Sequence, residues 1–463
     1  MKPEGRPFEV GFLTCASRRV KPDMVLKRHQ QAADQVSRVS DDLGLSLAVG
    51  GVLHSDDELG SMAAQIGQPS AVVLHYAGWT EDQTVLAIVD AFDCPIMLWV
   101  TDDVFVEGVS QLVAHVGYME ASAFLTKLHK RFFRYNGGPS IDSGAELHAF
   151  LRASSAVAEL RGLRFGWIGE GYGSRGILDT AFDEKALTAA LGVQFERIPL
   201  DVIFERYSRS PAPEQNLSQL KSLGVDVDEL RRWLPHDPTT LNDSLRLTLV
   251  LADIAAEHNL HALSLRCFPE FRHNGVPSPC LAISALNQNR IPASCEGDVL
   301  SGVSMFVLSK LSGAPATMMD IYARDDDANT LELAHCGSAA LDLARRGSSD
   351  RNMDIQYATH CKPANHRAGV TLEFALPPGR ISSLKLDMID DVCRLFLYQG
   401  DALVPDRRLR GTHATVRTDS PTRCLVERLI DQAVSHHAVL APGDVGREAV
   451  YFAAIAGLEL ICL

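Results

Sequence analysis

The sequence predicts an α/β protein: two doubly wound parallel-sheet domains, then a smaller β-rich (barrel-like) C-terminal domain. In roughly the first two thirds of the chain, short apolar segments typical of buried strands alternate with helical segments. This alternation is the pattern of parallel sheets whose faces are covered by helices. Beyond about residue 365 the helices give way to closely spaced β-rich segments. The length of 463 residues fits two or three domains.

The first predicted domain comprises residues 1–158. Its strand-like segments are residues 9–14, 45–52, 71–76 and 95–100. A polar helical segment at about residues 22–43 separates the first two of them. We expect these strands to form one parallel sheet.

The second predicted domain comprises residues 159–345, and the third comprises residues 346–463. In the second domain, the predicted strands are residues 163–168, 193–198, 261–267 and the segment around Asp320. In the third, they are residues 369–374, 381–386, 392–398, 412–418 and 458–463. Residues 387–391 are a plausible hairpin loop, which indicates an antiparallel sheet or barrel.

Composition excludes several classes of protein. The net charge of −14 argues against a general nucleic-acid or anionic-membrane binder, because phosphate binding needs clustered Lys and Arg. No apolar run approaches the ~18 to 20 residues of a membrane-spanning helix, and the first residues lack the apolar core of a signal peptide. The 10 cysteines contain no CxxC pair and are interpreted as small buried residues. We therefore expect a cytoplasmic protein.

The main candidate for chemistry is residues 291–298, Ile-Pro-Ala-Ser-Cys-Glu-Gly-Asp, here called the carboxylate stretch. It places Glu296 and Asp298 on a Gly-containing connection. Asp320 follows Glu296 by 24 residues with one helix between them, which we interpret as one βαβ step. The two acids would then converge at the carboxyl edge of a parallel sheet. With a histidine from the His436-His437 pair, they would hold a divalent metal.

A second motif, residues 171–176, matches GxGxxG, and Glu196 lies 20 residues beyond it. This spacing is a dinucleotide-binding fingerprint when the helix opens inside the motif. Here the loop continues to about residue 180, and Glu196 falls inside a predicted strand rather than at its end. We interpret the motif as a loop at the carboxyl edge of a sheet.

Several segments, in this order, resemble the L-fucose isomerase and L-arabinose isomerase superfamily. They are Arg-Cys-Phe-Pro-Glu at 266–270, residues 279–299, Asp320, His-Cys-Gly at 335–337, and residues 436–444. The resemblance implies a divalent cation, usually Mn²⁺ with Mg²⁺ or Co²⁺ as alternatives. Matched to the family, Glu296, Asp320 and His437 are the metal ligands, and the two acids are also the proton-transfer groups.

The resemblance also implies further site residues and partners. His335 is a metal ligand or a substrate contact, and Arg18, Trp79 and Glu270 are expected to contact the substrate. His436 is expected to point away, because neighbours on an extended segment face opposite sides. The family forms oligomers, often hexamers, with the site at a subunit interface, so we expect a homohexamer or another homo-oligomer.

The predicted function is a metal-dependent aldose–ketose isomerase that converts an open-chain, fucose- or arabinose-like sugar through a cis-enediol. One alternative is an isomerase of a modified sugar, sulfonated or branched, with positive charge from Arg18, Arg19 or Lys127 in its pocket. Two others are a catalytically silent sugar-binding protein and a nucleotide-dependent oxidoreductase that uses residues 171–176.

Overall fold

The computed structural model describes residues 7–137, 141–170, 177–233, 238–345, 353–357, 369–405 and 409–463. The chain forms two compact units. The first consists of Met1–Ala158 with Val450–Ile455, and the second of Glu159–Ala449 with Ala456–Leu463. The three predicted domain boundaries stay a prediction.

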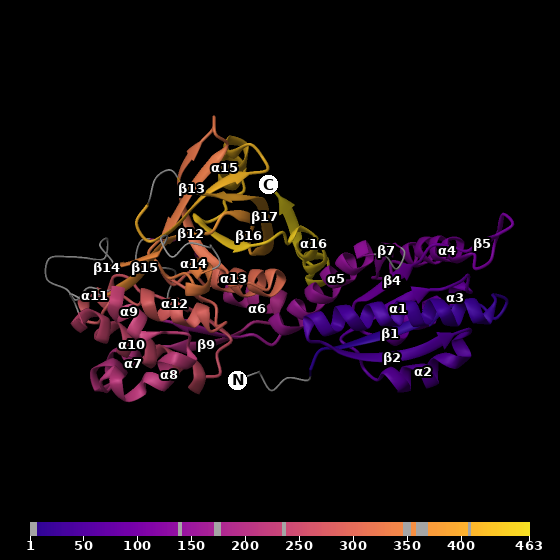
Figure 1. The fold of residues 1–463 in the computed structure, drawn as a ribbon, viewed down its shortest axis with the longest axis horizontal. Helices are drawn as coiled ribbons and strands as arrows, with labels where there is room; N and C mark the ends of the chain where they lie inside the picture. Colours follow the sequence, from indigo (N-terminus) through magenta and orange to yellow (C-terminus); the bar gives the residue numbers. More distant parts are fainter. Residues whose placement is uncertain are drawn as a thin grey trace. The chain divides into compact units, whose positions relative to one another are not determined.

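The first unit contains one five-stranded parallel sheet with the strand order β2-β1-β3-β4-β7. Its strands are β1 (Glu9–Cys15), β2 (Ser46–Leu53), β3 (Ala71–Tyr76), β4 (Ile96–Val100) and β7 (Phe133–Asn136). Its helices are α1 (Pro22–Leu43), α2 (Leu59–Ile66), α3 (Asp82–Ala91), α4 (Ala114–Lys127) and most of α5 (Ile141–Leu160). A short 3₁₀ helix, η1 (Asp56–Glu58), and a small hairpin, β5 (Phe105–Val106) with β6 (Val109–Ser110), complete it. The helices flank the strands in Figure 1.

The central strands of this sheet are buried along almost their whole length, because helices cover both faces. The order of the strands places a topological switch point between β1 and β3, where ligands of such sheets bind. Arg18 follows the end of β1, and Trp79 follows the end of β3. The backbone N–H of Ser17 donates to the carbonyl of Trp79 at 2.7 Å, so the two loops lie against each other.

The second unit contains a four-stranded parallel sheet with the strand order β11-β10-β8-β9. The strands are β8 (Arg164–Ile168), β9 (Gln194–Ile198), β10 (Ala262–Leu265) and β11 (Ala293–Ser294). Helical elements between these strands are α6 (Glu184–Leu191), α7 (Leu200–Arg209), η2 (Pro213–Asn216), α8 (Leu217–Ser222), α9 (Val227–Trp233), α10 (Pro238–Glu257), α11 (Glu270–His273) and α12 (Cys280–Gln288). Figure 1 shows α7 to α10 together on one side of this unit.

Six further strands of the second unit close into an antiparallel barrel. They are β12 (Thr317–Asp325), β13 (Thr330–His335), β16 (Gly379–Ile389), β17 (Val392–Leu403), β18 (Thr412–Thr418) and β19 (His437–Pro442). They pair in the ring β18-β13-β12-β19-β16-β17, and β17 pairs again with β18. Closure leaves these strands with no free edge. The strands β14 (Met353–Tyr357), β15 (Val370–Ala375) and β20 (Glu459–Cys462) extend the sheet at its two ends.

The predicted fold class is confirmed: parallel-sheet regions precede a barrel of antiparallel strands. The predicted hairpin loop is also present, as a turn at Asp390 and Asp391 between β16 and β17. Both residues have positive φ, 53° and 59°, which is the conformation of a two-residue type I′ hairpin turn. The remaining helices are α14 (Leu341–Arg345), α15 (Thr422–Asp431) and α16 (Gly446–Ala456).

Helix α13 (Val299–Ser312) joins the parallel sheet to the barrel. It packs against β10 and β11 on one side and against β16 and β19 on the other. Nearly every residue of the helix is buried, because it is apolar on all its faces and has a sheet on two sides. The start of this helix therefore lies where the two sheets meet. In the part of the chain that the structure describes, no helix combines the length and apolar character needed to cross a membrane.

Candidate metal and proton-transfer site

The carboxylate stretch turns sharply between β11 and α13. Glu296 follows β11 with φ of 61°, and Gly297 follows with φ of 73°. Left-handed backbone is uncommon for a residue with a side chain, and it clusters at functional sites. The N–H of Gly297 donates to the carbonyl of Leu265 at 3.1 Å, which ties the turn to the end of β10. As a result, Glu296 and Asp298 face different surroundings although only one residue separates them.

Asp298 is the N-cap of α13 and is fully buried. Its Oδ1 accepts from the N–H of Ser301 at 2.8 Å. Its Oδ2 accepts from the Nδ1 of His437 at 2.9 Å and from the Nζ of Lys385 at 3.1 Å. Burial alone would raise the pKa of Asp298, but Lys385 and His437 outweigh burial and hold this pKa well below its ordinary value. Asp298 is therefore a carboxylate that accepts hydrogen bonds and supports its neighbours.

Asp320 and His437 are directly opposite each other on the antiparallel strands β12 and β19. Residues paired in this way project to the same face of a sheet. The Nε2 of His437 lies 3.4 Å from Oδ1 of Asp320 and 3.7 Å from Oε2 of Glu296. The structure thus brings the three sequence-predicted ligands together.

The route by which Asp320 reaches the site differs from our expectation. We predicted that Glu296 and Asp320 would end neighbouring parallel strands, one βαβ step apart, and this prediction is wrong. The strand β12 belongs to the barrel, where both of its neighbours are antiparallel. The helix between the two acids crosses from one sheet to another, because α13 is buried between them.

His335, the last residue of β13, lies beside the same cluster. Its Nε2 is 3.9 Å from Oε1 of Glu296, and its ring centroid is 5.7 Å from that of His437. The backbone N–H of Cys336 donates to Nδ1 of His335 at 2.8 Å. A neutral imidazole whose Nδ1 accepts carries its proton on Nε2. His335 therefore presents an N–H to Glu296.

His437 has the opposite tautomer. Its Nδ1 donates to the ionised Asp298, so the lone pair of the neutral ring is on Nε2. Among the residues that the structure describes, this buried Nε2 has no hydrogen-bond partner, and it points toward two carboxylates. Burial alone would lower the pKa of His437, but the hydrogen bond and charge of Asp298 outweigh burial and raise this pKa.

His436 does not point away from the site, contrary to our prediction. Its Nε2 is 3.9 Å from Oδ1 of Asp320, and its ring lies against that of His437 with centroids 3.9 Å apart. The rule of alternating faces does not apply, because β19 begins only at His437. Asp179 fixes the ring instead, since its Oδ2 accepts from the backbone N–H of His436 at 3.0 Å and contacts Nδ1 at 2.7 Å.

The donor atoms of the cluster suit a divalent cation. One set of mutually close ligand atoms comes from Glu296, His436 and His437, and another from Asp320, His335 and His437. Burial raises the pKa of Glu296, and the charge of nearby Asp320 adds to this effect. A cation would relieve that repulsion. Carboxylate oxygens with one imidazole lone pair are typical of Mn²⁺ or Mg²⁺ sites.

The other sequence-predicted residues have partners of their own. Arg18 and Trp79 belong to the first unit, where Arg18 pairs with Glu58 and Trp79 donates its Nε1–H to Glu120 at 2.7 Å. Glu270 begins α11 beyond the end of β10 and pairs with Arg266 at 3.1 Å. Their roles as substrate contacts stay predictions.

The GxGxxG segment at residues 171–176 lies outside the described residues. Glu196, which would bind the ribose of a dinucleotide, is in the middle of β9. Its two carboxylate oxygens contact Arg164 and His258, each at 3.1 Å. A carboxylate occupied in this way does not favour the oxidoreductase alternative.

Sequence reasoning missed Lys385 and Asp179. Lys385 is on β16, inside the apolar run Ile-Ser-Ser-Leu-Lys-Leu, and is almost fully buried. A lysine in a buried strand is rare unless it is paired, so its position in an apolar run could have indicated a buried acidic partner. Asp179 lies in a loop with no periodicity, and its contact with His436 spans 257 residues.

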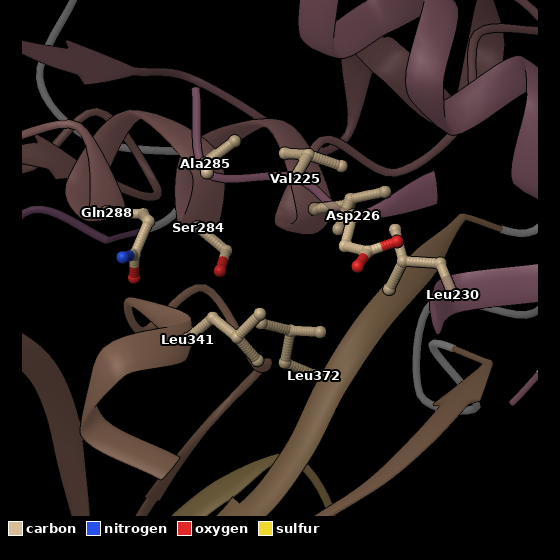
Figure 2. A pocket seen from close by; sticks show the side chains of 10 residues that line it. Val225, Asp226, Leu230, Ser284, Ala285, Gln288, Leu341 and Leu372 are labelled. Atoms are coloured by element: carbon tan, nitrogen blue, oxygen red, sulfur yellow. The ribbon is translucent and has the colours of Figure 1, made fainter. Parts of the chain in front are cut away.

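Two small cavities lie in the second unit. One is lined mostly by apolar residues of α12 and the segment around Val225, and Figure 2 shows that its lining comes from several separate segments. Its volume is about 20 Å³, room for a single water. The other is of similar volume and borders His436 and His437, with Ser383, Lys385 and Tyr398 in its wall. The first is a packing gap, whereas the second adjoins the site.

Comparisons with known proteins agree with this arrangement. The chain is 25% identical to the sulfoquinovose isomerase of Alkalicoccus urumqiensis over 400 residues, which cover 86% of this chain and 87% of that protein. It is 27% identical to the sulfoquinovose isomerase of Clostridium sp. (strain MSTE9) over 377 residues, which cover 80% of each. It is 25% identical to that of Priestia aryabhattai over 385 residues, which cover 82% of each. No protein-family model matches the chain.

Fold, site and similarity together define the class of protein. The chain is similar to sulfoquinovose isomerases, which are sugar ketol-isomerases of the L-fucose isomerase and L-arabinose isomerase superfamily. Its enzyme class is accordingly that of the aldose–ketose isomerases.

Proposed function

We propose that the protein is a metal-dependent isomerase of a sulfonated aldose of the sulfoquinovose type. The observation that carries the proposal is the similarity to sulfoquinovose isomerases over 80–86% of the chain. This similarity favours the sulfonated alternative over the fucose- or arabinose-like sugar of our first interpretation. The cluster of two carboxylates and histidines supports the same chemistry.

In the proposed site, Glu296, Asp320 and His437 hold the cation, which we assign as Mn²⁺ because of the mixed oxygen and nitrogen ligands. When bound, such a cation polarises the substrate oxygens and makes the adjacent C–H more acidic. His437 contributes its Nε2 lone pair, which Asp298 keeps directed at Glu296 and Asp320.

The proton moves between C1 and C2 of the open-chain sugar by way of a cis-enediol. Glu296 is our choice for the group that carries it, because its carboxylate lies at the centre of the cluster, 3.7 Å from Nε2 of His437 and 3.9 Å from Nε2 of His335. Asp320, on the barrel strand β12, contacts the oxygens of the substrate. Each proton taken from one carbon is returned to the next, so the reaction needs no external oxidant.

His335 is proposed as a substrate contact rather than a metal ligand. Its Nδ1 accepts from the backbone of Cys336, so the proton of the neutral ring is on Nε2, which favours donation to a sugar oxygen over binding of a cation. Glu270, Arg18 and Trp79 stay proposed substrate contacts. For the sulfonate we retain Arg18, Arg19 and Lys127 as candidates, and a homo-oligomer as the expected assembly.

The proposal is tested with a panel of aldoses and the purified protein supplemented with Mn²⁺. The panel contains sulfoquinovose, its unsulfonated counterpart quinovose, L-fucose and L-arabinose. NMR in D₂O should show the ketose of sulfoquinovose and exchange of the proton at C2, with much less product from the other sugars. About one Mn²⁺ per chain should be bound. Equal turnover of quinovose would overturn the substrate assignment, and full activity without metal would overturn the mechanism.

A further inference from the structure

Lys385 is a buried cation that the proposed reaction does not use. Only 3% of it is exposed. Its Nζ donates to Oδ2 of Asp298 at 3.1 Å and to the hydroxyl of Ser301 at 2.6 Å. A lysine is rarely buried unless it is paired, so this position calls for an explanation.

One carboxylate oxygen connects Lys385 to the candidate metal ligand. Oδ2 of Asp298 accepts from Lys385, from the Ser301 hydroxyl at 2.5 Å and from Nδ1 of His437 at 2.9 Å. A carboxylate that is kept ionised can only accept hydrogen bonds. The proton of the neutral His437 ring must then be on Nδ1, which leaves the Nε2 lone pair in the site.

Lys385 also lies near the segment that leads into His436 and His437. On the same strand, Asp387 accepts from the backbone N–H of Ser435 at 2.7 Å. The positive charge of Lys385 acts on Asp387 as well as on Asp298. The lysine therefore serves two carboxylates, one that orients the His437 ring and one that fixes the backbone before it.

We propose that the buried Asp298–Lys385 pair is a positioning device that fixes the tautomer and orientation of His437 for cation binding. This inference rests on the proposed function for the identity of the bound group, but its geometry does not depend on a sugar. Partners behind a ligating histidine typically change metal affinity by about 10- to 100-fold.

The first test compares Lys385→Met with Lys310→Met, a matched control on α13. Lys310 pairs with Glu159 at the surface and lies over the ring of Phe306, away from the cluster. Mn²⁺ dissociation constants are measured by titration on the full chain. Lys385→Met should weaken binding about 10- to 100-fold, and Lys310→Met should change it by less than about twofold. A folded Lys385→Met protein that binds Mn²⁺ as tightly as the parent overturns the proposal.

A chemical rescue separates positioning from packing. Lys385→Ala leaves space that joins the cavity bordered by Ser383 and Tyr398. Propylammonium added to this variant should recover Mn²⁺ affinity by about tenfold, since it restores a donor and a charge beside Asp298. Propanol fills the same space without the charge and should give no recovery. Equal recovery by both would show that Lys385 only fills space.

Two further measurements keep the outcome decisive. If Lys385→Met does not fold, the double variant Asp298→Asn with Lys385→Met removes both buried charges and should fold. It should bind Mn²⁺ weakly. Tight binding by the double variant overturns the proposal. In the metal-free parent, at a pH where the His437 ring is neutral, ¹⁵N NMR of labelled histidine should show its proton on Nδ1 alone, and in the lysine variant a mixture of tautomers. A parent with that tautomer but no Mn²⁺ binding would sink the proposed function, whereas a parent that binds Mn²⁺ but has the His437 proton on Nε2 when metal-free would overturn the positioning role.

Discussion

Two buried histidines, one in each unit, have opposite environments. The ring nitrogens of His75 in β3 contact hydroxyls, with Nε2 3.2 Å from Thr101 and Nδ1 3.4 Å from Thr14, and the ring lies beside Trp99. Burial lowers the pKa of His75 to about 3. His437 is equally buried, yet Asp298 raises its pKa. Burial alone keeps a core histidine neutral, whereas an ionised carboxylate beside a buried histidine orients the ring and, when the ring is neutral, places its lone pair on the opposite nitrogen.

The comparison also explains why the two positions differ in what they can bind. Both ring nitrogens of His75 contact hydroxyls, so neither has a free direction. Nε2 of His437 instead faces Glu296 and Asp320 at 3.7 Å and 3.4 Å. An imidazole is ready to bind a cation when one ring nitrogen donates a hydrogen bond to a neighbour and the other faces further ligands.

We expect the largest effect, a loss of turnover, when the carboxylate of Glu296 that faces His437 is removed. Glu296→Gln keeps the size of the side chain but removes the proton carrier. Turnover measured at saturating Mn²⁺ should fall by about 10² to 10⁴, the contribution of a positioned acid–base group. The control is Glu332→Gln on β13, whose side chain accepts from Thr415 in the barrel. Near-normal turnover by Glu296→Gln would mean that another group moves the proton.

The next effect separates the two histidines directly. His437→Gln removes a ligand, so the Mn²⁺ dissociation constant should rise by more than the ~10- to 100-fold typical of outer partners. His75→Gln should leave this constant within about twofold of the parent value, and it should lower the free energy of unfolding by about 1 to 3 kcal/mol through buried polar groups left unpaired. Titration with Mn²⁺ and denaturation of the same samples measure both quantities. A loss of affinity in the His75 variant would contradict the comparison.

Much of the fold followed from the sequence, because burial on two faces leaves continuous apolar runs such as β3 and β4. The β16–β17 hairpin was also predictable, since its turn lies between two alternating β segments. The role of α13 was not, because an apolar helix shows that it is buried but not which sheets bury it. That single gap produced the wrong βαβ step between Glu296 and Asp320.

Within the site, the sequence predicted the candidate metal ligands but not the residues that hydrogen-bond to them. Glu296, Asp320 and His437 were predicted by type and order, and they lie together. The contact between Lys385 and Asp298 spans 87 residues and joins the barrel strand β16 to the start of α13, so no local pattern shows it. The direction of His436 depends on where β19 begins, and a shift of one residue at a strand boundary changes which face a side chain takes.

The smallest expected effect is the contribution of His75 to the pH dependence of the free energy of unfolding. Because the folded pKa of His75 is below its unfolded value, the unfolded chain binds the extra proton, and stability is lost as pH falls below about 6.5. Between about pH 7 and pH 5 this histidine should remove about 2 kcal/mol from the free energy of unfolding of its unit. Urea denaturation at both pH values should show a shallower dependence for His75→Gln than for the parent protein. The control is His129→Asn. His129 is exposed, lies between α4 and β7 and has positive φ, a conformation that Asn tolerates. This variant should keep the pH dependence of unfolding of the parent protein. If His75→Gln also keeps the parent slope, His75 is not held neutral by burial, and the contrast with His437 fails.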